Sequence, residues 1–401
     1  MNAAHNAVFG LGNNIDFEVT CDLSTIIKLA EQYDIRKVEL TEFGRVQSER
    51  DLLVSILEFM RQGNGGEYFV ETPQVLAQCA ARFSIRRTLG GTSVRSAIAA
   101  AKRGMPVTLH LVSMNEDTRR LLPKGCEYLC SAECERLYPH LIVQFNKGQH
   151  IEFGDIDFTV PRSNRVIYVN DPDNCNLLLS DRLGDALANA RLFLISGFNA
   201  MRDEMLLQNR LDTLVDSIRR LPKGGRVFFE DACYHNKSFG NIVNRALVPY
   251  VDIFSMNEDE LSGYVRRSIN LLDAQEVAGA LREVRHRIPV PQLVVHTRYW
   301  ALCFGKDVAE LAPALRGGIA MATTRLCLGD DYTEQDYQKT TWMAVEREGA
   351  QFAVQISELL GHEAWCEPSI LVSTNTPTTI GLGDAFVGGF LAEYLFGIMD
   401  S

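Results

Sequence analysis

The chain has 401 residues, of which 46% are hydrophobic and 23% charged, and this balance excludes a disordered, collagenous or coiled-coil protein. Its length exceeds the roughly 250–300 residues at which a single core stops growing, which favours two cores. The formal net charge of −11 disfavours nucleic acid as a partner. The sequence has no apolar run of about 18 residues for a membrane span, so we expect no membrane partner. Ten scattered cysteines without a disulfide-like framework predict a reduced, cytoplasmic setting.

The first predicted element is a buried strand over residues 7–12, which delivers polar residues at its carboxyl end. Asn14 and Asp16 follow it. Because they are two residues apart, they face the same way on an extended chain and offer groups that bind sugar hydroxyls. A local turn is the alternative. Further on, an apolar stripe over 52–60 predicts an amphipathic helix that ends at the glycine cluster 63–66, a suitable hinge or substrate loop.

Strands and helices then alternate. Gly90 and Gly91 precede a predicted helix of small residues over 92–103, where they would let the backbone approach a polyhydroxyl ligand; turn chemistry alone is the alternative. The apolar strands predicted at 106–112, 190–197, 226–230, 252–257 and 292–296 are separated by helical stretches. This order predicts a doubly wound, largely parallel sheet.

A second, smaller unit is predicted from segments that alternate like short antiparallel strands, namely 141–145, 151–153 and 166–169. Together with residues 17–85 they form a discontinuous lid. The predicted division therefore places 1–16, 86–140 and 171–401 in a large α/β domain, and 17–85 and 141–170 in the lid.

The strongest motif lies near the end, where Gly381, Leu382 and Gly383 precede Asp384 at a predicted helix start. Backbone N–H groups and the helix dipole favour an anion there. A carboxylate beside an anion is repelled unless it has a task, such as removing a proton from an attacking hydroxyl. The alternative is a capped helix with an aspartate in its first turn.

Together these motifs resemble the ribokinase-like superfamily. Four further motifs, Pro161-Arg-Ser-Asn-Arg165, Ile195-Ser-Gly-Phe-Asn199, Asn257-Glu-Asp-Glu260 and His296-Thr297, resemble the ADP-dependent glucokinase and phosphofructokinase family. The resemblance runs from about Ala7 to Leu395. It implies a ribokinase-like three-layer α/β sandwich with a mostly parallel central sheet and a smaller lid. It also implies a kinase that transfers the β-phosphoryl of ADP to the primary hydroxyl of a hexose or hexose phosphate with Mg²⁺, releasing AMP.

The resemblance also implies roles for single residues. Asp384 would be the base, and Gly381, Leu382 and Gly383 would form the anion hole. Asn257 and Glu260 match the Asn-x-x-Glu motif that orders Mg²⁺ largely through water, and Glu230 matches the glutamate of a His-x-Glu motif whose histidine position holds Phe228. His296 and Thr297 would meet the nucleotide. Read individually, these residues are also consistent with ordinary charges and capping groups at strand ends.

The sugar is left open. Lys147, Arg162 and Arg165 supply cations on the presumed lid and favour a phosphorylated sugar such as fructose 6-phosphate, and Arg95 is a further candidate phosphate ligand. Glu67 instead matches a glutamate of glucose-using members. The rival functions are an ATP-dependent kinase of the same superfamily and, because of Phe228, a non-catalytic sugar- or nucleotide-binding relative. We expect a monomer or a small homo-oligomer.

Overall fold

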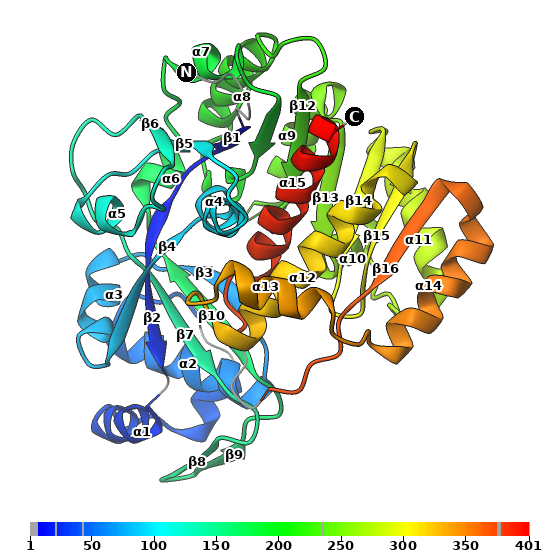
Figure 1. Ribbon diagram of the computed structural model, residues 1–401. Helices are drawn as coiled ribbons and strands as arrows, with labels where there is room; N and C mark the ends of the chain where they lie inside the picture. The colour runs from blue at the N-terminus through cyan, green and yellow to red at the C-terminus, as the bar shows by residue number, and fades with distance from the viewer. Residues whose placement is uncertain (1–6, 21, 42–43, 235, 375–377, 401) are drawn as a thin grey trace.

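The computed structural model describes residues 7–20, 22–41, 44–234, 236–374 and 378–400. Within these residues the chain forms two main sheets, one of nine strands and one of five, with helices packed around them. Figure 1 shows the smaller sheet below the larger one, with the helices α4, α12 and α15 in front of the larger sheet. None of the helices in the described ranges combines the length and the apolar character needed to cross a membrane.

The larger sheet has the strand order β16-β15-β14-β13-β12-β11-β1-β5-β6. Its strands are β1 (Ala7–Gly10), β5 (Val107–Leu111), β6 (Glu127–Cys130), β11 (Leu192–Ile195), β12 (Arg226–Glu230), β13 (Ile253–Asn257), β14 (Gln292–His296), β15 (Trp300–Gly305) and β16 (Ala364–Pro368). All neighbours are parallel except the pairs that β15 makes with β14 and β16. The predicted α/β fold with a mostly parallel sheet is therefore confirmed.

Both faces of the larger sheet are buried, because helices cover each face. Alternate side chains of a strand therefore join opposite cores. On β12, Phe228 joins the core formed with α4 (Thr92–Lys102), α12 (Ala312–Leu328) and α15 (Leu382–Asp400). Its neighbour Phe229 joins the opposite core. The helices of that second core are α7 (Leu183–Leu187), α8 (Glu204–Ile218), α9 (Lys237–Leu247), α10 (Glu258–Val265), α11 (Ala274–Arg287) and α14 (Arg347–Leu360). The result is a three-layer arrangement.

The smaller sheet has the strand order β3-β10-β7-β2-β4. Its strands are β2 (Asn14–Thr20), β3 (Gly66–Phe69), β4 (Ile85–Gly90), β7 (His140–Phe145) and β10 (Asn164–Val169). One face packs on α2 (Glu49–Gln62), whose predicted apolar stripe is buried. The other face carries polar residues at alternate positions of β2, from Asn14 through Asp16 to Glu18. This polar face holds much of the candidate site.

Shorter elements complete the chain. They are α1 (Leu23–Gln32), α3 (Pro73–Ala80), α5 (Glu116–Leu121), α6 (Pro172–Asn176), α13 (Glu334–Thr341), the 3₁₀ turns Lys37–Thr41, Phe198–Ala200, Val248–Tyr250, Val308–Leu311 and Gly361–Glu363, and the ribbon of β8 (His150–Phe153) with β9 (Ile156–Thr159). The segment 151–153 therefore pairs in this separate ribbon and not in the five-stranded sheet.

The boundary between the two sheets differs from the predicted division in three places, of which the smallest is His140, the first residue of β7. The chain turns at Gly12, where φ is +82°, and enters β2 at Asn14, so residues 14–16 pair within the smaller sheet. Residues 86–90 belong to β4 and pair there as well. The predicted first strand over 7–12 thus ends at Gly10. Asn14 and Asp16 are on an extended chain, as expected, but this chain is a separate strand of the smaller sheet and not the local turn that was the alternative.

Candidate active site

Strand register brings Asn14, Asp16 and Gly90 together on the polar face of the smaller sheet. Asn14 is opposite Gly90, and its Nδ2 donates to Asp16 Oδ1 at 2.6 Å. A Cβ atom on Gly90 would lie 2.3 Å from Asn14 Nδ2 and 2.5 Å from Asp16 Oδ2. Because glycine has no Cβ atom, position 90 makes room for the side chains of Asn14 and Asp16. Gly91, with φ at +94°, is the residue that turns the chain into α4.

Arg95, in the second turn of α4, ties that helix to the smaller sheet. Its buried Nη2 lies 2.6 Å from Asp16 Oδ2, 3.1 Å from Glu18 Oε1 and 3.2 Å from Thr88 Oγ1. Burial raises the pKa of Asp16, while the charges of Arg95 and His140 act in the opposite direction. Asp16, expected from the sequence as a sugar ligand, is thus already one partner of a buried ion pair.

His140 starts β7 directly opposite Asp16, a position that the sequence analysis did not single out. Its Nε2 lies 3.3 Å from Asp171 Oδ2, and its Nδ1 lies 3.9 Å from Asp16 Oδ1. Burial opposes the charged imidazolium, but Asp171, Asp16 and Glu67 outweigh it and raise the pKa of His140. The sequence holds no signal for this group, because the contact depends on the pairing of β2 with β7.

The glycine turn before α15 lies between two cationic side chains. Gly381 has φ at +66°, and a Cβ atom there would lie 3.0 Å from Arg95 Cδ. A Cβ on Gly383 would lie 3.3 Å from His296 Cε1. Helix α15 begins at Leu382, so Asp384 stands in its first turn. The helix start and the close approach of its glycines agree with the predicted motif.

Asp384 is surrounded by positive charge. The charge of Asp384 acts to raise the pKa of four basic side chains, namely Arg95, Arg165, Arg325 and His296. For Arg165 and Arg325, burial outweighs this effect. The Asp384 backbone carbonyl also accepts a hydrogen bond from a serine of α4 at 2.9 Å. A helix start, glycine N–H groups and several cations together favour a bound anion such as a phosphoryl group.

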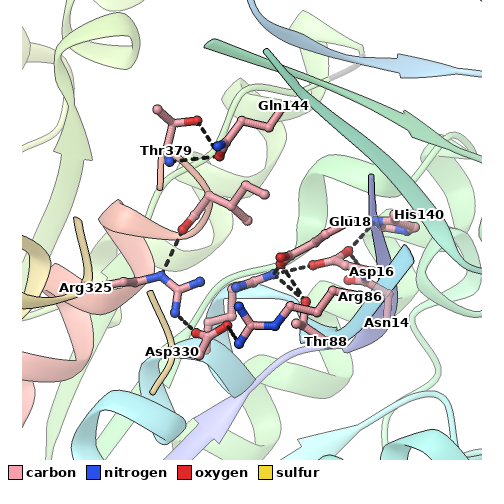
Figure 2. A network of polar contacts seen from close by, with 12 residues as sticks. Asn14, Asp16, Glu18, Arg86, Thr88, His140, Gln144, Arg325, Asp330 and Thr379 are labelled. Carbon is pink, nitrogen blue, oxygen red and sulfur yellow. Dashed lines mark hydrogen bonds and ion pairs between the residues drawn. The ribbon is translucent and has the colours of Figure 1, made fainter. Parts of the chain in front are cut away.

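Arg325, near the end of α12, is a second site residue that the sequence analysis missed. Its Nε donates to the Ile380 carbonyl at 2.9 Å. Figure 2 shows the ion pair that its guanidinium forms with Asp330. Asp330 also pairs with Arg86 of β4 at 3.2 Å. Burial lowers the pKa of Arg325 to about 10, and the like charge of Arg95 acts in the same direction. This chain of contacts joins the smaller sheet to the glycine turn.

Gln144 makes a second connection between the smaller sheet and the glycine turn. Its Oε1 on β7 accepts from Thr379 N at 3.1 Å and from Thr379 Oγ1 at 3.3 Å (Figure 2). Thr379 is two residues before Gly381. A strand of one sheet is therefore attached directly to the segment that leads into α15.

The predicted sugar-phosphate cations do not all gather at this site. Arg165 of β10 is within the electrostatic reach of Asp384, and its Nε has no hydrogen-bond partner among the described residues. Arg162 is exposed and donates to the Gly63 carbonyl at 2.8 Å, so it holds the glycine loop. Lys147 is exposed in the turn after β7. Lys147 and Arg162 thus occupy exposed turns next to β7 and β10, whereas Arg165 is on the strand β10 itself.

Glu67 lies on β3, next to β10. Asn199 Nδ2 is 3.5 Å from Glu67 Oε1, and the charge of Glu67 contributes to the raised pKa of His140 and opposes the lowered pKa of Arg165. Glu67 and Arg165 therefore belong to the same polar face, although the sequence analysis took them as arguments for two different sugars.

A second group of acids and bases lies at the ends of β12, β13 and β14. His296 Nε2 lies 2.9 Å from Glu230 Oε1, and the imidazole stacks on Phe386 at 4.7 Å between ring centroids. Burial opposes the imidazolium, but Glu230 outweighs it and raises the pKa of His296. Phe228, at the position where the family carries histidine, packs against Phe390 of α15. The imidazole beside Glu230 thus comes from β14 and not from β12.

Asn257 and Glu260 form the cap of α10. Asn257 Oδ1 accepts from the backbone N–H groups of Asp259 at 2.8 Å and Glu260 at 3.0 Å, and Glu260 Oε2 accepts from Asn257 N at 2.8 Å. This reciprocal box explains locally why asparagine and glutamate stand three residues apart. Similarly, the Thr297 hydroxyl donates to the Trp300 carbonyl at 2.9 Å and so holds the turn between β14 and β15. The Thr297 hydroxyl also accepts from the backbone N–H groups of Tyr299 and Trp300, both at 3.1 Å.

Three buried carboxyl groups, those of Glu230, Asp231 and Glu260, lie at this cap and at the end of β12. Burial raises the pKa of Glu260, and Asp231 and Glu230 add to the increase. Burial also raises the pKa of Asp231 to about 7, against a hydrogen bond from Tyr264 at 2.6 Å. Glu230 Oε2 is buried without a hydrogen-bond partner in the described part of the chain. No group of three or more His, Cys, Asp or Glu side chains within the described ranges is arranged as a direct metal cage.

The three-layer fold and the aspartate at a glycine-lined, cation-flanked helix start define the class of protein: it is a phosphotransferase that acts on an alcohol group, a kinase. The chain belongs to the ADP-specific phosphofructokinase/glucokinase family, whose conserved region matches residues 5–392. Kinases of this family take ADP as the phosphoryl donor. No curated protein sequence matches the chain.

Solved structures share the fold at low sequence identity. A hypothetical ADP-dependent phosphofructokinase from Pyrococcus horikoshii is 18% identical, with a TM-score of 0.78 and coverage of 99% of both chains. A phosphofructokinase from the same organism with AMP is 19% identical, with a TM-score of 0.76 and the same coverage. An ADP-dependent kinase complexed with fructose-6-phosphate and ADPβS is 15% identical over 97% of this chain and 93% of that one, with a TM-score of 0.72.

Proposed function

We propose that this protein transfers the β-phosphoryl group of ADP to the primary hydroxyl of a hexose phosphate, with fructose 6-phosphate as the first candidate, and releases AMP. One observation carries the proposal. Asp384 stands at the glycine-lined start of α15 beside Arg95, and Arg95 binds Asp16 on the polar face of the smaller sheet. A base, an anion site and a polar sugar-binding face therefore meet at one place.

The proposed step needs little beyond positioning and charge. The sugar hydroxyl oxygen bonds to the β-phosphorus while the bond from that phosphorus to the bridging oxygen breaks, and the bridging oxygen leaves with AMP. Asp384 takes the hydroxyl proton. The N–H groups of Gly381, Leu382 and Gly383 and the guanidinium of Arg95 stabilise the negative charge of the migrating phosphoryl.

The preference for a phosphorylated acceptor rests on Arg165. Its guanidinium is largely buried on the polar face, and its Nε is left without a partner among the described residues. A sugar phosphate would satisfy that donor with a charge-assisted hydrogen bond. A relative of the same fold carries fructose-6-phosphate and ADPβS, which agrees with this choice. Glucose is the second candidate, favoured by Glu67 on the same face, because a carboxylate accepts hydrogen bonds from neutral sugar hydroxyls.

We place the nucleotide beside His296 and a Mg²⁺ ion beside Glu230. The residues fit a divalent cation, because Glu230 Oε2 is buried without a described partner and burial raises the pKa of both Asp231 and Glu260. Glu230 would hold the ion directly or through water, and Asn257 and Glu260 would orient its water ligands. When bound, the ion offsets the negative charge of the diphosphate. We further propose that the smaller sheet acts as a lid that excludes water.

A panel of donors and acceptors tests the proposal. The purified protein is incubated with fructose 6-phosphate or glucose and with ADP, ATP or GDP, and AMP and the phosphorylated sugar are both quantified. We expect AMP only with ADP and a higher kcat/KM for fructose 6-phosphate. Turnover with ATP but not ADP would contradict the proposed donor. Binding of both ligands without AMP formation would support a non-catalytic relative.

A further inference from the structure

A cavity of about 480 Å³ opens beside β4, the edge strand of the smaller sheet. Its walls come from β4, from α4, from residues 121–124 after α5 and from residues 330–332 after α12. Gly381 and Ala385 of the catalytic segment also reach it. The lining residues include neither Asp384 nor Asp16, although Arg95 and Gly381 belong both to the cavity wall and to the proposed phosphoryl site.

Basic side chains outnumber carboxylates in the lining of this cavity, although the whole chain is acidic. Six basic side chains line it, namely Arg86, Arg87, Arg95, Lys102, Lys124 and Arg325, against two carboxylates, Asp330 and Asp331. Asp330 is shared between Arg86 and Arg325. Lys102 donates to the backbone carbonyl of Asp330 at 2.8 Å, and Lys124 forms no ion pair within the described residues. Arg95 pairs with Asp16 and Glu18, and Arg87 pairs with Asp117. Within the described residues, the lining cations without a carboxylate partner are therefore Lys102 and Lys124.

Two of these cations are held in an unfavourable setting. Burial lowers the pKa of Arg325, and the charge of Arg95 lowers it further. Burial also lowers the pKa of Lys102, and the charge of Arg325 contributes to this decrease. Like charges gathered in a poorly solvated wall are stabilised when an anion neutralises them.

The remaining walls are apolar. They are formed by Leu89 of β4, Ile98, Ala99 and Ala101 of α4, and Leu121 and Pro123 after α5. The ring of Tyr332 also lines the cavity, with Lys102 Nζ 4.1 Å from its centroid. Apolar walls with a few convergent charged groups, and a volume within the range of about 300–1,000 Å³, are typical of sites for small organic ligands.

We propose that this cavity is a second ligand site, which binds a small organic phosphate whose phosphoryl group meets Lys102, Lys124 and Arg325 and whose carbon skeleton lies on the apolar wall. The site does not depend on the function proposed above. Because Gly381 and Ala385 line the cavity, its occupant would lie beside the glycine turn. Arg95 and Arg325 line the same cavity, so the ligand would also contact them.

Isothermal titration of the full chain with phenyl phosphate, inorganic phosphate and phenol tests the chemistry. We expect phenyl phosphate to bind at least about 10-fold more tightly than inorganic phosphate, because it uses the apolar wall as well as the cations, and phenol not to bind up to about 10 mM. Equal affinity for the two phosphates would remove the apolar part of the proposal. Absence of saturable binding by phenyl phosphate up to about 10 mM would overturn it.

Charge variants locate the site. Lys124→Glu should weaken phenyl phosphate binding at least about 10-fold, and Lys124→Gln should weaken it less, because only the first reverses the charge. Lys28→Glu, on an exposed position of α1, is the matched control and should leave binding unchanged. Arg165→Gln, on the polar face, should also leave it unchanged. If Arg165→Gln abolishes binding while Lys124→Glu does not, phenyl phosphate occupies the sugar site and the second site does not exist.

Discussion

Arg95 Nη2 lies 2.6 Å from Asp16 Oδ2, and both side chains are buried. Asp16 is on β2 of the smaller sheet, whereas Arg95 is on α4, which packs against the larger sheet. Removing one partner of such a pair leaves an uncompensated buried charge. We therefore expect Arg95→Met to lower the free energy of unfolding by about 3–5 kcal/mol, and the double variant Arg95→Met with Asp16→Asn to lose less than the sum of the single losses. Urea denaturation of the four proteins measures this. Strictly additive losses would mean that the two groups do not interact.

Asp384 is the base of the proposed transfer. Asp384→Asn keeps the size and hydrogen-bonding capacity of the side chain but cannot take the proton. We expect kcat to fall by about 100- to 10,000-fold, with sugar and ADP still bound. Asp216→Asn, on the exposed side of α8, is the control and should retain full activity. Wild-type kcat in the Asp384 variant would exclude proton removal by this residue.

Gly90 faces two polar side chains at distances that no Cβ atom tolerates. Gly90→Ala should displace Asn14 or Asp16 and lower the free energy of unfolding by about 1–3 kcal/mol. Gly279→Ala provides a matched control within α11, where a Cβ atom meets nothing within 4 Å. There the same substitution should stabilise the protein by up to about 1 kcal/mol, since alanine favours a helix. Equal stability changes in the two variants would contradict the crowding at Gly90.

His140 links stability to pH through its carboxylate neighbours. Because the folded state raises the pKa of His140, the folded protein holds the proton more tightly than the unfolded chain. Its contribution is therefore fully present below the unfolded pKa of about 6.5 and is lost as the pH rises through the folded pKa. His140→Gln should cost more stability at pH 6 than at pH 9, measured by urea denaturation. His362→Gln, at an exposed position, is the control. A pH-independent difference would mean that His140 is not protonated between Asp16 and Asp171.

Glu260 orients the proposed metal ion indirectly. Glu260→Gln can keep the hydrogen bond to Asn257 N but removes a negative charge. We expect the Mg²⁺ concentration for half-maximal activity to rise about 10- to 100-fold, while the melting temperature measured without Mg²⁺ does not fall. Glu276→Gln, in the first turn of α11, should leave the metal titration unchanged. An unaltered titration in the Glu260 variant would separate this residue from the metal.

Much of the fold follows from local patterns. Apolar runs such as 192–195 and 253–257 form buried parallel strands because both faces of the sheet are covered, and the stripe on α2 is buried because it repeats at helical spacing. The glycine turn and the first-turn position of Asp384 also follow from the order of residues. Each of these features depends on neighbours in sequence.

The features that sequence analysis missed depend on partners far apart along the chain. Arg95 and Asp16 are 79 residues apart, and His140 reaches Asp16 only through the pairing of β2 with β7. The presence of basic residues in the sequence did not indicate which of their side chains face the candidate site. Arg165 stands on a strand face, whereas Arg162, three residues earlier, is held by a loop carbonyl.

The bond between Gln144 and Thr379 connects the smaller sheet to the segment that leads into the glycine turn. If the smaller sheet rotates toward the larger one, β7 either pulls the residues before Gly381 along or gives up two hydrogen-bonding interactions. Substrate binding and the positioning of the Gly381–Gly383 backbone around the phosphoryl group would then occur together. The glycine turn of the enzyme without substrate would therefore differ in geometry from that of the enzyme with substrate bound.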